Sequence, residues 1–310
     1  MLKATARHRA ERLLLVSVRT IAEKIPLSVL RPALEGAASL AFRVGIRRRV
    51  VVENLRAALG ADATGAKARR IAKKCYREFG RIVAEFVRSE ELLRDPEAAF
   101  RVQGLDTLAG AAARGQGVVI LTAHLGNFIA GSYLVCRMGH SLTLVARHMS
   151  NPLVDADIEA IYAKYGTRVI AVRGSKNDPG GGLRIFRALR KGETVVLLND
   201  QDAGEDSYRS TFLGLPTFIP AGPARYAVRA GATVLTAFVT RVDGRIDVQF
   251  QDPIDYSGAS GPEEAKALIL DEYSRRLEAK VREAPASYFW FHKKWKGVPE
   301  IRARYEGRVP

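Results

Sequence analysis

Short β-rich runs that alternate with helical patterns constrain the fold of this 310-residue chain more than any other feature. Runs of β-branched and aliphatic residues occupy 117–123, 142–146, 167–172 and 193–199. Segments with helical spacing lie between them, at about 127–138, 153–165 and 181–190. Parallel strands need crossover connections of this kind, because a tight hairpin joins only antiparallel neighbours. The alternation predicts an α/β protein with a mainly parallel central sheet and flanking helices.

The second half of the chain continues with different patterns. The stretches ATVLTAFVTR and RIDVQFQ flank the turn residues VDG, which predicts an antiparallel hairpin. A long amphipathic helix is predicted at about 262–283, and the basic aromatic stretch SYFWFHKKWKG follows it.

The N-terminal region is basic and amphipathic. The chain carries 49 Lys and Arg against 33 Asp and Glu, a net charge of +16, and residues 1–56 supply about half of it. Apolar residues there keep roughly helical spacing, and 66–95 reads as one or two further helices. Basic amphipathic helices suit an anionic membrane surface, although a solvated helical layer on the main domain has the same pattern. We therefore expect a helical, membrane-associating region at 1–95 and an α/β domain at 96–310.

Several other classes of protein are disfavoured. No run approaches the roughly 20 apolar residues of a spanning helix, and no secretory signal is recognised, so membrane contact is expected to be peripheral or monotopic. The two cysteines make no disulfide framework, and no metal-ligand spacing occurs, so no metal is expected. Nucleic-acid binding would account for the charge, but no nucleic-acid motif supports it.

One histidine stands where chemistry is expected. His124 follows the strand-forming stretch VVILTA, and LGN after it opens a helix. Ligands of open α/β sheets bind at the carboxyl ends of strands. An imidazole there can take a proton from a hydroxyl, and the first backbone N–H groups of the helix can hold an oxyanion. A purely structural histidine would fit the same place.

Two more stretches are candidates for the site. Asp200, Gln201 and Asp202 follow the last parallel strand and should share its edge of the sheet, where acids can orient a histidine, bind a cation or only form a turn. The stretch PAGPA reads as a helix start at Gly222 and Pro223.

The order of these pieces carries a resemblance. The stretches AHLGN, ARHMSNPLVD, NDQD, FLGLPTFIPAGPARYAVRAGA and YFWFHKKWK, in that order, resemble the bacterial lysophospholipid acyltransferase superfamily. The closest likeness is to the branch of late acyltransferases of lipid A biosynthesis and related glycolipid acyltransferases. It extends from RRRVVVENLRAAL to Lys296. The resemblance implies transfer of a fatty acyl group from an acyl thioester to a hydroxyl of a membrane glycolipid or phospholipid.

The resemblance also implies roles for single residues. His124 matches the catalytic base, and Asp200 is the second catalytic candidate. The substrate-binding residues that it implies are Asn127, Arg147, Asn151, Gln201, Gly222 and Pro223, with Arg147 on a phosphate. Asp202, beside Gln201, is a further substrate-binding candidate. The expected donor is acyl carrier protein or coenzyme A carrying the acyl chain, with no other cofactor. The expected place is the cytoplasmic face of the bacterial inner membrane, on anionic lipid.

The sequence departs from the family pattern at one position. The family has an acid five residues after the histidine, where this chain has Ile129, and no Asp or Glu occurs from 107 to 154. A carboxylate partner orients imidazole and stabilises imidazolium, which isoleucine cannot do. Three interpretations stay open. Asp200 or Asp202 replaces the acid, His124 works alone, or the chain is a non-catalytic lipid-binding or partner protein.

The site at the strand ends makes a geometric prediction. Arg147, Asp200 and His124 should lie around one cleft that has an apolar arm for an acyl chain. The acceptor stays open between a lipid A precursor, a phosphatidylinositol mannoside and another lipid.

Overall fold

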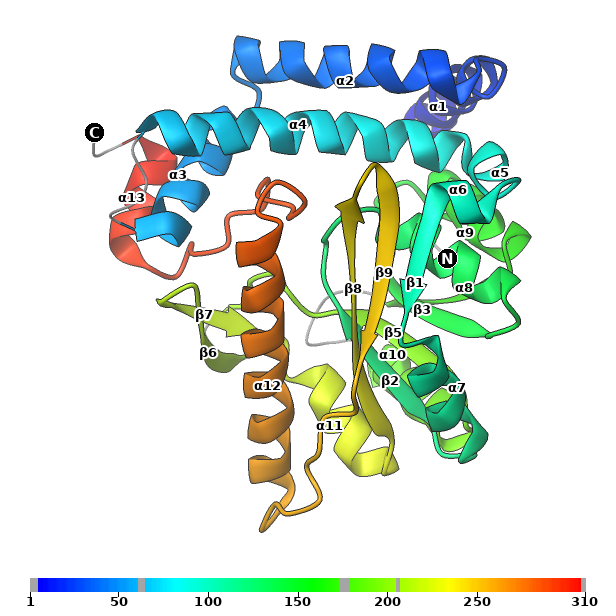
Figure 1. The fold of residues 1–310 in the computed structure, drawn as a ribbon, viewed down its shortest axis with the longest axis vertical. Helices are drawn as coiled ribbons and strands as arrows, with labels where there is room; N and C mark the ends of the chain where they lie inside the picture. The colour runs from blue at the N-terminus through cyan, green and yellow to red at the C-terminus, as the bar shows by residue number, and fades with distance from the viewer. Residues whose placement is uncertain (1–4, 61–64, 173–178, 205–206, 308–310) are drawn as a thin grey trace.

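A computed structural model describes residues 5–60, 65–172, 179–204 and 207–307 (Figure 1). Its seven-stranded sheet has the order β1-β9-β8-β2-β5-β3-β4. The strands are β1 (Phe100–Gln103), β2 (Val118–Thr122), β3 (Leu142–Arg147), β4 (Thr167–Val172), β5 (Thr194–Leu198), β8 (Thr233–Val242) and β9 (Arg245–Gln251). Strands β8, β2, β5, β3 and β4 run parallel, and β9 is antiparallel to β8. The predicted α/β class, the four parallel strands and the hairpin are confirmed.

Two features of the sheets go beyond the prediction. Strand β1 pairs with β9 at one edge, and a second sheet joins β6 (Tyr208–Phe212) to β7 (Leu215–Ile219). The turn of this small hairpin is Leu213-Gly214, with φ of 54° and 78°. Positive φ at both central residues suits the right-handed twist of a two-residue hairpin. Gly214 therefore closes a tight turn, and the stretches that flank it form strands.

Helices cover both faces of the sheet. Along β2, Val118 and Ile120 belong to one apolar cluster while Val119 and Leu121 belong to the other, as the two-residue period of a strand requires. The first cluster includes residues of α7 (Leu105–Ala113), α8 (Phe128–Arg137) and α9 (Pro152–Lys164). The second includes residues of α10 (Pro179–Arg190), α11 (Gly222–Ala230) and α12 (Pro262–Glu283).

The N-terminal helices lie at one end of the sheet. They are α1 (Ala6–Ala22), α2 (Leu27–Val44), α3 (Arg48–Leu59), α4 (Gly65–Val87), α5 (Ser89–Leu92) and α6 (Pro96–Ala99), and α13 (Pro299–Glu306) packs on α3. In Figure 1, α4 crosses that end of the sheet and α2 lies along its outer side. Residues of α3 and α4 share an apolar cluster with β2. The division at residue 95 stays a prediction.

Helix α1 buries none of its residues. Leu13 and Leu14 expose 68% and 65% of their surface, and Val44 at the end of α2 exposes 66%. None of the helices described is long and apolar enough to cross a membrane.

Candidate active site

The register of the parallel sheet brings His124 and Asp200 together. Strands β2 and β5 are parallel neighbours in which Thr122 lies opposite Leu198. His124 and Asp200 each come two residues after these paired ends, so both side chains reach the same point at the carboxyl edge. The His124 Nδ1 atom lies 2.8 Å from Asp200 Oδ1, and the backbone N–H of His124 donates to the same oxygen at 3.1 Å. The edge therefore carries a histidine–carboxylate pair.

The electrostatics of this pair favour a charged aspartate. Asp200 is only 2% exposed, and its burial raises the pKa of the carboxyl. The charge of His124 and its hydrogen bonds outweigh burial, so the pKa of Asp200 lies below its usual value. Burial lowers the pKa of His124, but the charge and hydrogen bond of Asp200 together raise it above its usual value. The lowered pKa of Asp200 and the raised pKa of His124 both favour the charged forms, as expected for an ion pair.

The C-terminal segment holds the loop of Asp200 in place. The buried ammonium of Lys294 donates to the backbone carbonyl of Asp200, and the Tyr288 hydroxyl donates to the same carbonyl at 3.4 Å. Burial lowers the pKa of Lys294 to about 8. The imidazole of His292 accepts the backbone N–H of Asp202 at 3.3 Å, and burial lowers its pKa, which suits a neutral acceptor. This segment therefore acts as a clamp on the loop 200–202.

The other imidazole nitrogen of His124, Nε2, is an acceptor that meets a long contact from Gln201. With Nδ1–H given to Asp200, Nε2 carries the lone pair, and the side-chain amide nitrogen of Gln201 lies 3.5 Å from it. His124 also lines a cavity of about 260 Å³. Its other lining residues are mainly apolar: Cys75, Glu78, Phe79, Ile82, Val83, Phe86, Gly126, Phe128, Ile129, Ala286, Ser287, Tyr288, Phe289 and Phe291. A proton acceptor and an apolar cavity thus meet at one residue.

Position 129 belongs to the wall of this cavity. Ile129 packs against the apolar cluster around α8 and lines the cavity with His124. The carboxylate on the imidazole comes instead from Asp200, as the first of the three interpretations requires. Asp202, the other candidate acid, accepts the backbone N–H of Gly204 at 2.8 Å and lies 3.7 Å from the Lys296 ammonium.

A buried ion network fixes the turn after His124. Asn127 caps α8 by accepting the Ala130 N–H, and its amide donates to Glu85 of α4 at 2.9 Å. The Glu85 carboxylate also accepts from Arg241 at 2.9 Å and from Arg31 at 3.0 Å. Asn127 is 1% exposed, so its polar atoms are committed to the scaffold. This placement is typical of a structural role, and the substrate-binding role of Asn127 stays a prediction.

The remaining predicted residues lie elsewhere. Arg147 is exposed at the end of β3, which β5 separates from β2, and it is not among the lining residues of the His124 cavity. Asn151 caps α9, and its amide donates to the His8 carbonyl at 2.9 Å and to Glu11. Gly222 and Pro223 open α11 and do not line that cavity either. Of the predicted cleft, the structure therefore brings His124 and Asp200 together. The roles of Arg147, Asn151, Gly222 and Pro223 stay predictions.

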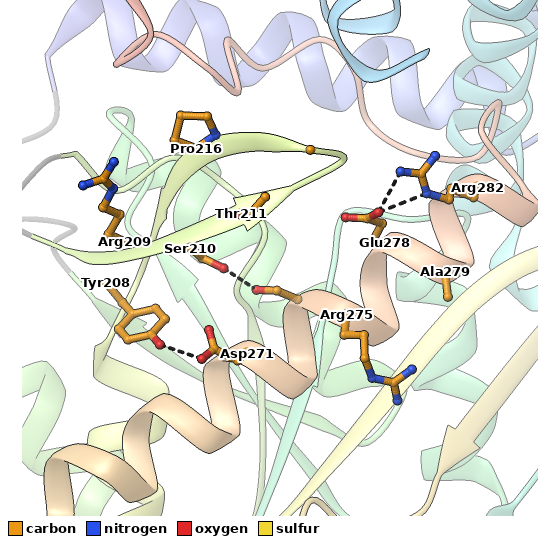
Figure 2. Close-up of a pocket in the computed structure, with 12 residues that line it drawn as sticks. Tyr208, Arg209, Ser210, Thr211, Pro216, Asp271, Arg275, Glu278, Ala279 and Arg282 are labelled. Atoms are coloured by element: carbon orange, nitrogen blue, oxygen red, sulfur yellow. Dashed lines mark hydrogen bonds and ion pairs between the residues drawn. The ribbon is translucent and has the colours of Figure 1, made fainter. Parts of the chain in front are cut away.

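A larger cavity of about 940 Å³ lies between the β6–β7 hairpin and α12 (Figure 2). Three pairs of its polar side chains bond to one another: Tyr208 donates to Asp271 at 2.9 Å, Ser210 donates to Ser274 at 3.0 Å, and Arg282 donates to Glu278 at 2.7 Å. Neither His124 nor Asp200 lines it. Size alone therefore does not identify the candidate site.

A second histidine–aspartate pair lies at the surface. His148 Nδ1 is 2.6 Å from Asp155 Oδ2, and the side chain of His148 is 46% exposed. Water screens such an exposed pair, and it lacks the buried apolar cavity of His124.

Comparison with known proteins finds one matching family and curated relatives. The model of the bacterial lipid A biosynthesis acyltransferase family matches residues 4–297. A phosphatidylinositol mannoside acyltransferase of Mycobacterium tuberculosis is 33% identical over 135 residues, which cover 43% of this chain and 42% of that protein. One of Mycolicibacterium smegmatis is 28% identical over 131 residues, or 42% of each chain. The matched stretches thus span less than half the length of these curated relatives.

Proposed function

Because the chain belongs to the bacterial lipid A biosynthesis acyltransferase family, we propose that it moves a fatty acyl group from an acyl thioester to a hydroxyl of a membrane glycolipid. The observation that carries the proposal is the 2.8 Å contact between His124 and the buried Asp200, beside an apolar cavity. The glycolipid acceptor is supported by the relatives, which are named phosphatidylinositol mannoside acyltransferases.

His124, oriented by Asp200, acts first as a general base and then as a general acid. The acceptor hydroxyl gives its proton to Nε2 of His124 while its oxygen attacks the thioester carbonyl carbon. The resulting imidazolium is stabilised by Asp200 and held in orientation by the Nδ1–H bond. Collapse of the tetrahedral intermediate breaks the C–S bond, and the leaving sulfur takes the proton from Nε2. The products are an ester and a free thiol, and the imidazole is neutral again.

The start of α8 supplies donors for the oxyanion. The N–H groups of Phe128 and Ile129 precede the first i→i−4 bonds of α8, so the helix itself gives them no acceptor. The N–H of Gly126 is already given to the Ser287 carbonyl at 2.9 Å. Developing negative charge is also favoured at a helix N-terminus. In this mechanism the N–H groups of Phe128 and Ile129 are the proposed donors.

The N-terminal helices are proposed to hold the protein on the membrane. Exposed Leu13, Leu14 and Val44 would enter the interface while arginines of the same helices meet anionic headgroups. We place the protein peripherally on the cytoplasmic face of the bacterial inner membrane. Binding to anionic vesicles should fall as salt rises, because exposed charges are screened. Equal binding to neutral vesicles would contradict this placement.

An acyl-transfer assay tests the function. The purified chain is mixed with a bacterial glycolipid extract and with palmitoyl thioesters of acyl carrier protein or coenzyme A, and products are identified by mass. Wild type should add one acyl chain with one donor class. If wild type makes no acylated lipid with either class, yet binds acyl lipid, the chain is a lipid-binding protein and the proposal fails.

A further inference from the structure

Two apolar cavities adjoin at α4. The first contains His124 and measures about 260 Å³, and the second lies between α2 and α4 and measures about 620 Å³. Four residues line both cavities: Phe79, Val83, Phe289 and Phe291. A side chain that lines two cavities separates them, so these residues form a partition. The smaller cavity ends at this partition.

The partition is a cluster of three phenylalanine rings. The ring centroids of Phe79 and Phe291 are 5.3 Å apart, those of Phe289 and Phe291 are 5.1 Å apart, and those of Phe79 and Phe289 are 6.0 Å apart. The ring of Phe289 is also 5.9 Å from the His124 ring. The barrier between the cavities therefore begins next to the candidate base.

The three rings differ in how firmly the backbone holds them. The Phe289 N–H donates to the His124 carbonyl at 2.9 Å, and the Phe291 carbonyl accepts from Arg47 at 2.7 Å. Both belong to the C-terminal segment that clamps the site. Phe79 instead stands on α4, and 42% of it is exposed. Its side chain makes none of these hydrogen bonds, so its truncation leaves the hydrogen bonds of the site in place.

We propose that Phe79 determines the length of the acyl chain that the protein accepts. This inference rests on the proposed function. The chain runs from His124 into the smaller cavity and stops at the Phe79 ring. When that ring is removed or turned outward, the chain continues into the second cavity. Each methylene that becomes buried raises the binding affinity of the acyl chain about fourfold. A longer chain therefore binds more tightly only where the cavity continues.

A chain-length series tests this proposal. Values of kcat/KM are measured for saturated thioesters from octanoyl to stearoyl with wild type, Phe79→Ala, Phe79→Trp and Phe186→Ala. Phe186 lies on α10 against Arg229 and lines neither cavity, so it is the matched phenylalanine control. Beyond the wild-type optimum, Phe79→Ala should gain about fourfold per added methylene. Phe79→Trp should keep or shorten the optimum, and Phe186→Ala should keep it.

The outcome separates this inference from the proposed function. If wild type transfers acyl groups and Phe79→Ala gives the same chain-length profile, the partition does not limit the chain and the inference is overturned. If wild type transfers nothing, the proposed function fails, and calorimetric binding of fatty acids from octanoate to stearate still tests Phe79. Tighter binding of long chains to Phe79→Ala alone supports the inference, and unchanged binding overturns it. Phe79→Leu serves as a milder truncation if Phe79→Ala does not fold.

Discussion

Replacing Asp200 with asparagine removes the negative charge but keeps an acceptor oxygen 2.8 Å from His124 Nδ1. The imidazolium formed during transfer then loses its counter-charge while the ring keeps its place. Because both charges are spread over several atoms, their centres lie roughly 4 Å apart, which is worth about 4 kcal/mol at an effective dielectric constant near 20. At about 1.4 kcal/mol per factor of ten, kcat should fall about 10³-fold. A comparable neutralisation in serine proteases costs about 10⁴-fold.

The same variant should change the pH dependence of the rate. A general base must be neutral, so wild-type activity rises with pH through the pKa of His124, which Asp200 raises above its usual 6.5. In Asp200→Asn the charge that raises the pKa of His124 is gone, while burial still lowers that pKa. The acid limb of the profile should therefore move to lower pH although the maximum rate falls. Stopped assays with a thiol reagent across pH 5 to 9 would measure both effects.

Asp155→Asn is the matched control for this prediction. Asp155 forms the same kind of contact with His148, at 2.6 Å, but at the surface. Its loss should change the rate less than twofold. If Asp200→Asn keeps its rate within tenfold of wild type, or keeps the wild-type acid limb, the carboxylate does not support His124 and the mechanism is wrong.

Three further substitutions test the surroundings of the pair. Ile129→Glu should not raise activity, because Nδ1 of His124 already donates to Asp200. The new glutamate carboxyl lies in an apolar wall, so the variant should lose more stability in urea titrations as pH rises above about 4.3. Glu85→Leu should lower the free energy of unfolding by about 3 to 5 kcal/mol in the same titrations, since Arg241 loses a buried partner. Gly126→Ala should lower both thermal stability and activity, because φ is +55° and a Cβ would collide with the Val239 carbonyl.

The strand pattern predicted the edge of the sheet but not the choice of acid. The sequence predicts that His124 and the NDQD loop share the carboxyl edge of the sheet, and it leaves Asp200 or Asp202 open as the acid that replaces the one missing at Ile129. The register decides between them, because it pairs Thr122 with Leu198 and the Asn199 N–H donates to the Thr122 carbonyl at 3.0 Å. Register depends on hydrogen bonds between distant segments, which residue types alone do not specify.

The sequence does not predict that Glu85 and Lys294 are buried. Glu85 lies in a strongly charged helical segment whose acids look solvated, yet it is completely buried against Arg241 and Asn127. Lys294 lies in a basic tail, yet it is 2% exposed and holds the loop of Asp200. Helical period indicates which residues share a face but not what covers that face. One usable signal is the seven-residue spacing of Glu78 and Glu85, which puts both on one face of a helix. In the structure both contact Arg241.

The most direct test of the account is the lipid composition of cells. A strain that lacks this chain is complemented with wild type, with His124→Ala or with an empty vector, and its membrane lipids are compared by mass spectrometry at matched protein levels. Wild type should restore a glycolipid heavier by one acyl chain, and His124→Ala should match the empty vector. If His124→Ala restores the same lipid to the same level as wild type, His124 is not the base and the proposed mechanism is wrong.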